Sequence, residues 1–124
     1  DPGERALRLY DAMLAGEDAA FRAMRPGVTA AHVFETAVQA VRDAGVPDYR
    51  RHHVGHGVGL EVYDVPLLGP RDTTVLETGM TFEVETPFYE VGLAGLQPED
   101  TVVLREDGPE LLTTLSRKLE IVEP

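Results

Sequence analysis

The sequence predicts an α+β domain in which two helices cover one face of a mainly antiparallel sheet. Over residues 4–41, apolar side chains recur at three- and four-residue spacing, which is the period of a helix. After residue 50, the pattern changes to short extended runs that are separated by turn residues. The order of two helices followed by several strands therefore indicates the α+β class.

Two helices are predicted in the first part of the chain. The first covers residues 4–24 and ends at Pro26 and Gly27, because proline cannot continue the helical hydrogen-bond ladder. The second begins after Thr29, whose hydroxyl is suited to an N-cap, and ends before Gly45. The buried stripe of the second helix consists of Val33, Phe34, Ala37, Val38 and Val41.

Extended runs are predicted in the rest of the chain, with Gly108 in the turn between the last two. These runs cover residues 52–54, 58–62, 80–85, 101–105 and 119–122. The sequence contains no internal repeat and no linker long enough to separate two domains. We therefore expect residues 1–124 to form a single unit.

Composition and charge exclude several classes of protein. The 124 residues include no cysteine, which excludes disulfides and thiolate metal sites. A formal net charge of −11 and scattered basic residues predict no nucleic-acid partner. The apolar runs are far shorter than the roughly 20 residues that cross a bilayer, so we expect no membrane partner and a cytoplasmic protein. Because the chain begins with Asp1 and not Met, we expect a processed product or a piece of a longer protein.

A histidine cluster is the first candidate for chemistry. Three of the four histidines fall within five consecutive positions. On a strand, His52 and His56 would point to one face and His53 to the other, because side chains alternate. Gly55 and Gly57 lack a Cβ atom, so another backbone or a ligand can approach His56 closely. A glycine-rich turn that happens to contain histidine remains the alternative interpretation.

Carboxylates at the ends of two predicted strands are the second candidate. Glu85 ends an alternating run in which it shares the polar face with Glu83, and the chain must leave the sheet at Pro87. Glu99 and Asp100 form a carboxylate pair at the start of the next apolar run. Taken separately, Glu85 and the Glu99-Asp100 pair could also be ordinary acidic side chains that face solvent.

Taken together, the histidine cluster and the carboxylates at the ends of the two strands predict a metal site. One imidazole and two carboxylates on neighbouring strands form an oxygen-rich donor set that suits Mn²⁺ or Fe²⁺, and Zn²⁺ or Co²⁺ would also bind. Three ligands can hold one catalytic ion with an open position. Two ions bridged by carboxylates would need more acids than these strands supply, and the residues alone indicate no second pair.

At this point the sequence resembles a known family, the Xaa-Pro dipeptidases (prolidases) and aminopeptidases P, which are pita-bread metallopeptidases. The resemblance extends over essentially the whole chain and implies the C-terminal half of the catalytic domain, with the N-terminal half missing. The blocks that carry it are residues 55–62, 76–85, 99–103 and 106–113.

The resemblance also implies roles for individual residues. His56 would ligate one ion, Glu85 would ligate and assist proton transfer, and Glu99 would bridge two ions. His52 would face the substrate, and Tyr63 stands where prolidases usually have a histidine that contacts the substrate carbonyl. The family uses five ligands and two divalent ions, here most readily Mn²⁺, with Co²⁺, Zn²⁺ or Fe²⁺ as alternatives. The two aspartate ligands would come from the missing half.

The activity implied by the resemblance is hydrolysis of the peptide bond before proline in Xaa-Pro dipeptides or peptides, by a homodimer. One departure is Gln97, which stands where the family usually has arginine.

Two alternatives are a non-catalytic pita-bread module or fragment that binds a peptide or partner, and a metal-free hydrolase of the creatinase type. Retention of His56, Glu85 and Glu99 together argues against both.

Overall fold

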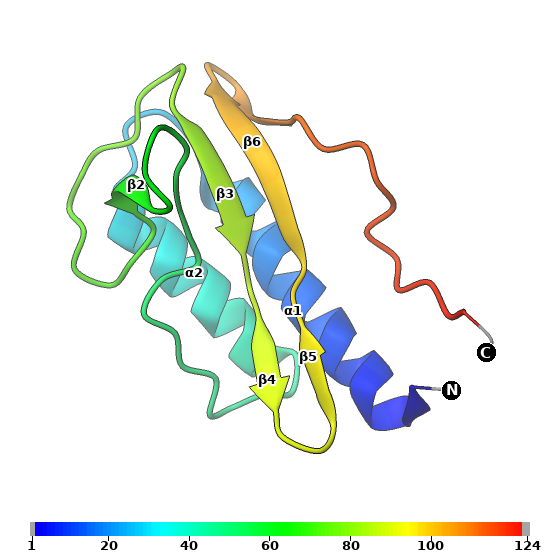
Figure 1. The fold of residues 1–124 in the computed structure, drawn as a ribbon. Coiled ribbons are helices and arrows are strands. Elements are labelled where there is room, and N and C mark those ends of the chain that lie inside the picture. Colours follow the sequence, from blue (N-terminus) through cyan, green and yellow to red (C-terminus); the bar gives the residue numbers. More distant parts are fainter. Residues whose placement is uncertain (1, 123–124) are drawn as a thin grey trace.

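Two helices pack on one side of an antiparallel sheet in the computed structural model, which describes residues 2–122 (Figure 1). The helices are α1 (Gly3–Ala23) and α2 (Ala30–Asp43). The five-stranded sheet has the order β2-β1-β3-β6-β7, and β4 and β5 form a separate two-stranded ribbon. The strands are β1 (Gly55–Gly57), β2 (Asp64–Leu67), β3 (Thr81–Glu85), β4 (Phe88–Glu90), β5 (Ala94–Leu96), β6 (Glu99–Arg105) and β7 (Gly108–Leu111).

The structure confirms both predicted helices. The Thr29 side chain accepts a hydrogen bond from the backbone N–H of His32 at 3.2 Å, so it is the N-cap of α2. The junction between the helices passes through Gly27, whose φ of +95° favours glycine. Within residues 2–122, neither helix has the length and apolar character that crossing a membrane requires.

The strand predictions are only partly correct. The runs predicted over residues 80–85 and 101–105 correspond to β3 and β6. Residues 52–54 and 58–62 form no strand; the strand in this region is β1, which lies between them. The reason is that Gly55 and Gly57 allow other backbone to approach. A Cβ on Gly55 would lie 2.3 Å from the carbonyl oxygen of Glu83, and one on Gly57 would lie 2.6 Å from that of Val65.

The last predicted strand is also wrong. Residues 119–122 contain no strand, because Ile121 and Val122 are exposed and no neighbouring strand pairs with them. The chain instead turns at residues 106–107, and β7 pairs directly with β6. The strands β2, β4, β5 and β7 were not predicted, because each has only three or four residues.

The sheet separates an apolar face from a polar face. Phe82, Val84, Val102 and Leu104 are fully buried and belong to the core that both helices share. Because side chains alternate along β3 and β6, the intervening residues point away from the helices. We call this second surface the open face. It carries His56, Glu83, Glu85, Glu99 and Thr101.

Arg117 attaches the C-terminal segment, residues 112–122, to the rest of the fold. Its guanidinium pairs with Glu17 and Asp18 of α1, each at 2.7 Å, and with Asp100 of β6 at 3.0 Å. The Tyr10 hydroxyl donates to the backbone oxygen of Arg117 at 2.9 Å. These contacts explain why the segment runs beside β6 and α1 in Figure 1.

The fully buried Glu17 side chain predicts a pH-dependent stability. Burial raises the pKa of Glu17 from 4.5 to about 7, against the lowering effect of its hydrogen bond from Arg117. Between pH 4.5 and about 7, Glu17 is therefore protonated in the folded state and ionised in the unfolded state. This contribution to the free energy of unfolding, about 3 kcal/mol at most, is complete below pH 4.5 and is lost as the pH rises through 7.

Urea unfolding at several pH values between 5 and 8.5 measures this contribution. The free energy of unfolding is expected to fall more steeply with rising pH for the parent than for Glu17→Gln, which cannot ionise. Identical pH dependence in the two proteins would exclude Glu17 as the titrating group.

Candidate functional site

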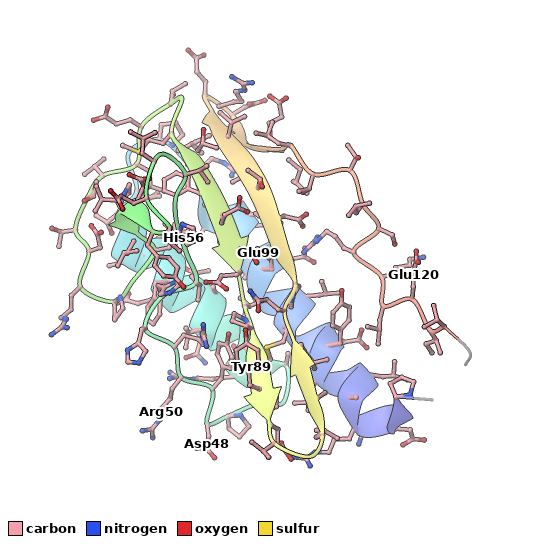
Figure 2. The ribbon with its side chains drawn as sticks, in the orientation of Figure 1. Asp48, Arg50, His56, Tyr89, Glu99 and Glu120 are labelled. Atoms are coloured by element: carbon pink, nitrogen blue, oxygen red, sulfur yellow. The ribbon has the colours of Figure 1, made fainter. Side chains whose placement is uncertain are left out.

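Three strands place the predicted metal ligands on the open face. His56 lies in β1, Glu85 ends β3, and Glu99 begins β6. The register puts Glu85 directly opposite Glu99, and puts His56 opposite Glu83, which is two residues from Glu85. Figure 2 shows His56 and Glu99 on the side of the sheet turned away from the helices. The antiparallel pairing therefore places on one face of the sheet three residues that are far apart in the sequence.

The two glutamates share a hydrogen-bonding partner. The side-chain amide of Gln97 donates to Glu85 Oε2 at 3.4 Å and to Glu99 Oε2 at 3.0 Å. Its oxygen accepts from the hydroxyl of Tyr89. Burial, and then the charge of Glu99, raise the pKa of Glu85, which is only 6% exposed. Two carboxylates held together in this way would gain from a cation between them.

His56 presents a free ring nitrogen. The residue is 8% exposed, and its Nδ1 lies 2.9 Å from the backbone oxygen of Gly57. Because a carbonyl oxygen only accepts, this contact places a proton on Nδ1, so in the neutral form of the ring the lone pair is on Nε2. A neutral imidazole fixed in this tautomer has the form that binds divalent metals.

Two aromatic side chains border His56. The ring of Tyr63 lies edge-on to that of His56, with 4.7 Å between the two ring centroids. Tyr63 also lies edge-on to His53, with 5.3 Å between their ring centroids. Tyr63 is more than half exposed. The structure thus places Tyr63 beside one predicted metal ligand, and its catalytic role stays a prediction.

His53 belongs to the site, although the sequence predicted that it faces away. Its Nδ1 lies 3.3 Å from Glu85 Oε1, without hydrogen-bond geometry, and its ring centroid is 6.2 Å from that of His56. Burial, and then the charge of Arg51, lower the pKa of His53, which favours the neutral ring. The expectation was wrong because residues 52–54 form no strand, so strict alternation does not apply to them.

His52 lies apart from the other predicted residues. It is exposed and lines a hollow of about 570 Å³ together with Arg51, Leu67 and Arg71. Neither Glu85 nor Glu99 contributes to that hollow. A role of His52 toward the substrate stays a prediction.

The donor set fits a divalent ion in its chemistry but is incomplete. No three histidine, cysteine, aspartate or glutamate side chains in residues 2–122 converge closely enough to hold a metal ion. His56 nevertheless has a free Nε2, and Glu85 and Glu99 are held together by Gln97 on the same face. Ligands from outside the described residues would be needed to complete a centre here.

Comparisons with known proteins found a matching family model and similar relatives. The family model described as metallopeptidase family M24 matches residues 1–106. The Xaa-Pro dipeptidase of Pyrococcus furiosus is 36% identical over 118 residues, which are 95% of this chain and 34% of that protein. The Xaa-Pro dipeptidase of Lactobacillus delbrueckii subsp. lactis is 34% identical over 122 residues, which are 98% of this chain and 33% of that protein.

A solved structure extends the likeness to three dimensions. The X-Pro aminopeptidase of Thermotoga maritima superposes with a TM-score of 0.90 at 32% identity, covering 98% of this chain and 35% of that one. The chain therefore spans about a third of the length of the relatives that it matches.

Proposed function

The chain belongs to metallopeptidase family M24, and from that premise we propose that it supplies His56, Glu85 and Glu99 to the metal centre of an Xaa-Pro peptidase. Its fold is the pita-bread fold of the prolidases and aminopeptidases P. The observation that carries the proposal is the pairing of Glu85 with Glu99 across β3 and β6, on the face that also holds His56. Residues 1–124 would form the C-terminal half of the catalytic domain.

The remaining ligands are proposed to be two aspartates from the N-terminal half of the same protein. That half would cover the open face, where no three donors converge by themselves. Two divalent ions, Mn²⁺ in our proposal, would provide a nucleophilic water near neutral pH and polarise the scissile carbonyl. Because the donors are oxygen-rich and include only one imidazole, Co²⁺, Zn²⁺ or Fe²⁺ could also bind.

Residues of this chain would handle protons and orient the peptide. Glu85 has a raised pKa, which suits a carboxyl that accepts a proton and returns it to the prolyl nitrogen as the bond breaks. Tyr63 would donate a hydrogen bond to the substrate carbonyl, and His52 would face the substrate. Proline lacks an N–H and has a fixed φ, so a site for its ring is chemically distinct from a general peptide site. A homodimer is also proposed.

A test compares the metal dependence of the complete protein with that of this chain by itself. The complete protein is expected to hydrolyse Ala-Pro, to lose this activity after chelation, and to recover it when Mn²⁺ is added. The chain alone is expected to be inactive, because it lacks two ligands. A complete protein that binds no divalent ion, and whose Ala-Pro cleavage no metal stimulates, would contradict the proposal and leave the non-catalytic pita-bread module and the metal-free hydrolase of the creatinase type.

A further inference from the structure

Asp100 is a carboxylate on the apolar face of the sheet. It follows Glu99 in β6, and the alternation of side chains puts it on the same side as the buried Val102 and Leu104. Its exposed fraction is only 5%. A buried carboxylate is costly unless charged or hydrogen-bonding groups surround it. The position of Asp100 therefore depends on the partners that it finds on this face.

Two partners of Asp100 come from the C-terminal segment. The hydroxyl of Thr113 donates to Asp100 Oδ1. The Nε atom of Arg117 lies 3.0 Å from Asp100 Oδ2, as an ion pair without hydrogen-bond geometry. The same guanidinium pairs with the fully buried Glu17 of α1 at 2.7 Å. The C-terminal segment thus ties the start of β6 to α1, on the face of the sheet opposite to the candidate metal centre.

The side chain of Glu99, by contrast, is little constrained by packing. Glu99 is exposed, and its carboxylate accepts a hydrogen bond from the surface side chain of Gln97 at 3.0 Å. The paired register of β3 and β6 ends at Glu99, opposite Glu85. A hollow of about 190 Å³, lined in part by Glu99, Asp100 and Arg117, leaves room for movement. The direction of the Glu99 carboxylate therefore depends on how firmly the backbone at the start of β6 is held.

We propose that Asp100 is a positioning residue for Glu99 in the candidate metal centre. The C-terminal segment holds Asp100 in place, so that Glu99 keeps the direction in which it binds metal. Consecutive strand residues share one backbone, so a shift of Asp100 moves Glu99 as well. Without the Arg117 guanidinium, the two buried carboxylates of Asp100 and Glu17 would lose their common cation and repel each other. The inference rests on the proposed function and adds a part of the chain that contacts neither metal nor substrate.

The test measures Mn²⁺ affinity of Thr113→Val and Arg117→Gln in the complete protein by calorimetric titration. Valine has nearly the shape of threonine but cannot donate to Asp100, so the affinity is expected to fall about 10-fold in Thr113→Val. It is expected to fall about 100-fold in Arg117→Gln and less in Arg117→Lys, which keeps the charge. The kcat for Ala-Pro is expected to fall in parallel, with KM little changed. Parental Mn²⁺ affinity in both Thr113→Val and Arg117→Gln would overturn the proposal.

Two matched variants separate positioning from general stability. Asp18→Asn removes another ion pair of Arg117, at 2.7 Å, and leaves the contact with Asp100 in place. Val33→Ala removes buried volume from α2 and lowers the thermal midpoint. Both variants are expected to keep the parental Mn²⁺ affinity. If Val33→Ala weakens Mn²⁺ binding as much as Arg117→Gln does, the effect is one of stability and the proposal is wrong.

Hydrogen exchange of the metal-free complete protein tests the positioning without metal or hydrolysis. Residues 97–101 are expected to exchange faster in Thr113→Val and Arg117→Gln than in the parent, whereas the α2 residues 30–43 are expected to exchange equally. Unchanged exchange at residues 97–101 in both variants would refute the inference.

The parent protein distinguishes failure of this inference from failure of the proposed function. A parent that binds no Mn²⁺ contradicts the proposed function, and the inference falls with it. A parent that binds Mn²⁺, together with variants that bind it equally well, contradicts the inference alone.

Discussion

Replacing Glu99 with alanine is expected to reduce kcat/KM for Ala-Pro by about a thousandfold or more. In the proposed centre, its carboxylate would help to hold the metal ions, and loss of several kcal/mol of charge stabilisation corresponds to this factor. Stability is expected to change by only about 0.5 kcal/mol, because Glu99 is exposed and its hydrogen-bonding partner is the surface side chain Gln97. Steady-state kinetics, metal content and urea unfolding of the complete protein measure the three effects.

Glu110→Ala provides the control for this variant. Glu110 is an exposed carboxylate of the same sheet, in β7, and forms an ion pair with Arg105 outside the site. This substitution is expected to leave both metal content and kcat/KM unchanged. Hydrolysis of Ala-Pro by Glu99→Ala at the parental rate would show that Glu99 does not bridge the ions.

Replacing Arg117 with alanine is expected to lower the free energy of unfolding by about 3 kcal/mol at pH 8, as when one partner of a buried ion pair is removed. The buried carboxylate of Glu17 loses its cation, and Asp18 and Asp100 lose the same partner. The guanidinium also lies over the ring of Phe21, 5.2 Å from its centroid, and that contact is lost as well. Urea unfolding at constant pH measures the difference.

The double variant Glu17→Gln/Arg117→Ala tests this explanation. Removing the buried charge together with its partner is expected to restore part of the lost stability, because no ionised group then remains buried at Glu17. Arg105→Ala breaks an exposed ion pair with Glu110 and is expected to cost less than about 1 kcal/mol. A loss in Arg117→Ala no larger than that in Arg105→Ala would mean that the buried pairing contributes little.

Prediction of the fold succeeded where the signal is local. The apolar period of the helices, the N-cap at Thr29 and the stop at Gly27 all depend on residues within one or two turns of each other. The strands β3 and β6 also carry a clear pattern, because one face of each is buried against the helices. The short strands β4 and β5 carry too few residues for such a pattern, and their pairing was missed.

The candidate site was only partly predictable. Alternation along β3 correctly separates Glu83 and Glu85 from the buried Phe82 and Val84. The same rule failed for His53, since the chain there does not continue as a strand and the ring turns toward Glu85. A signal for His53 was present in its position three residues before the predicted ligand His56, but nothing local gave its direction.

By itself, the sequence determined the two helices, the faces of the two long strands and the chemical types of the proposed metal ligands, because these depend on near neighbours along the chain. Only the tertiary structure decided that Gln97 joins Glu85 to Glu99 and that Arg117 reaches Glu17. Such contacts depend on strand register and on the packing of distant segments. No periodic pattern along the sequence predicts these contacts.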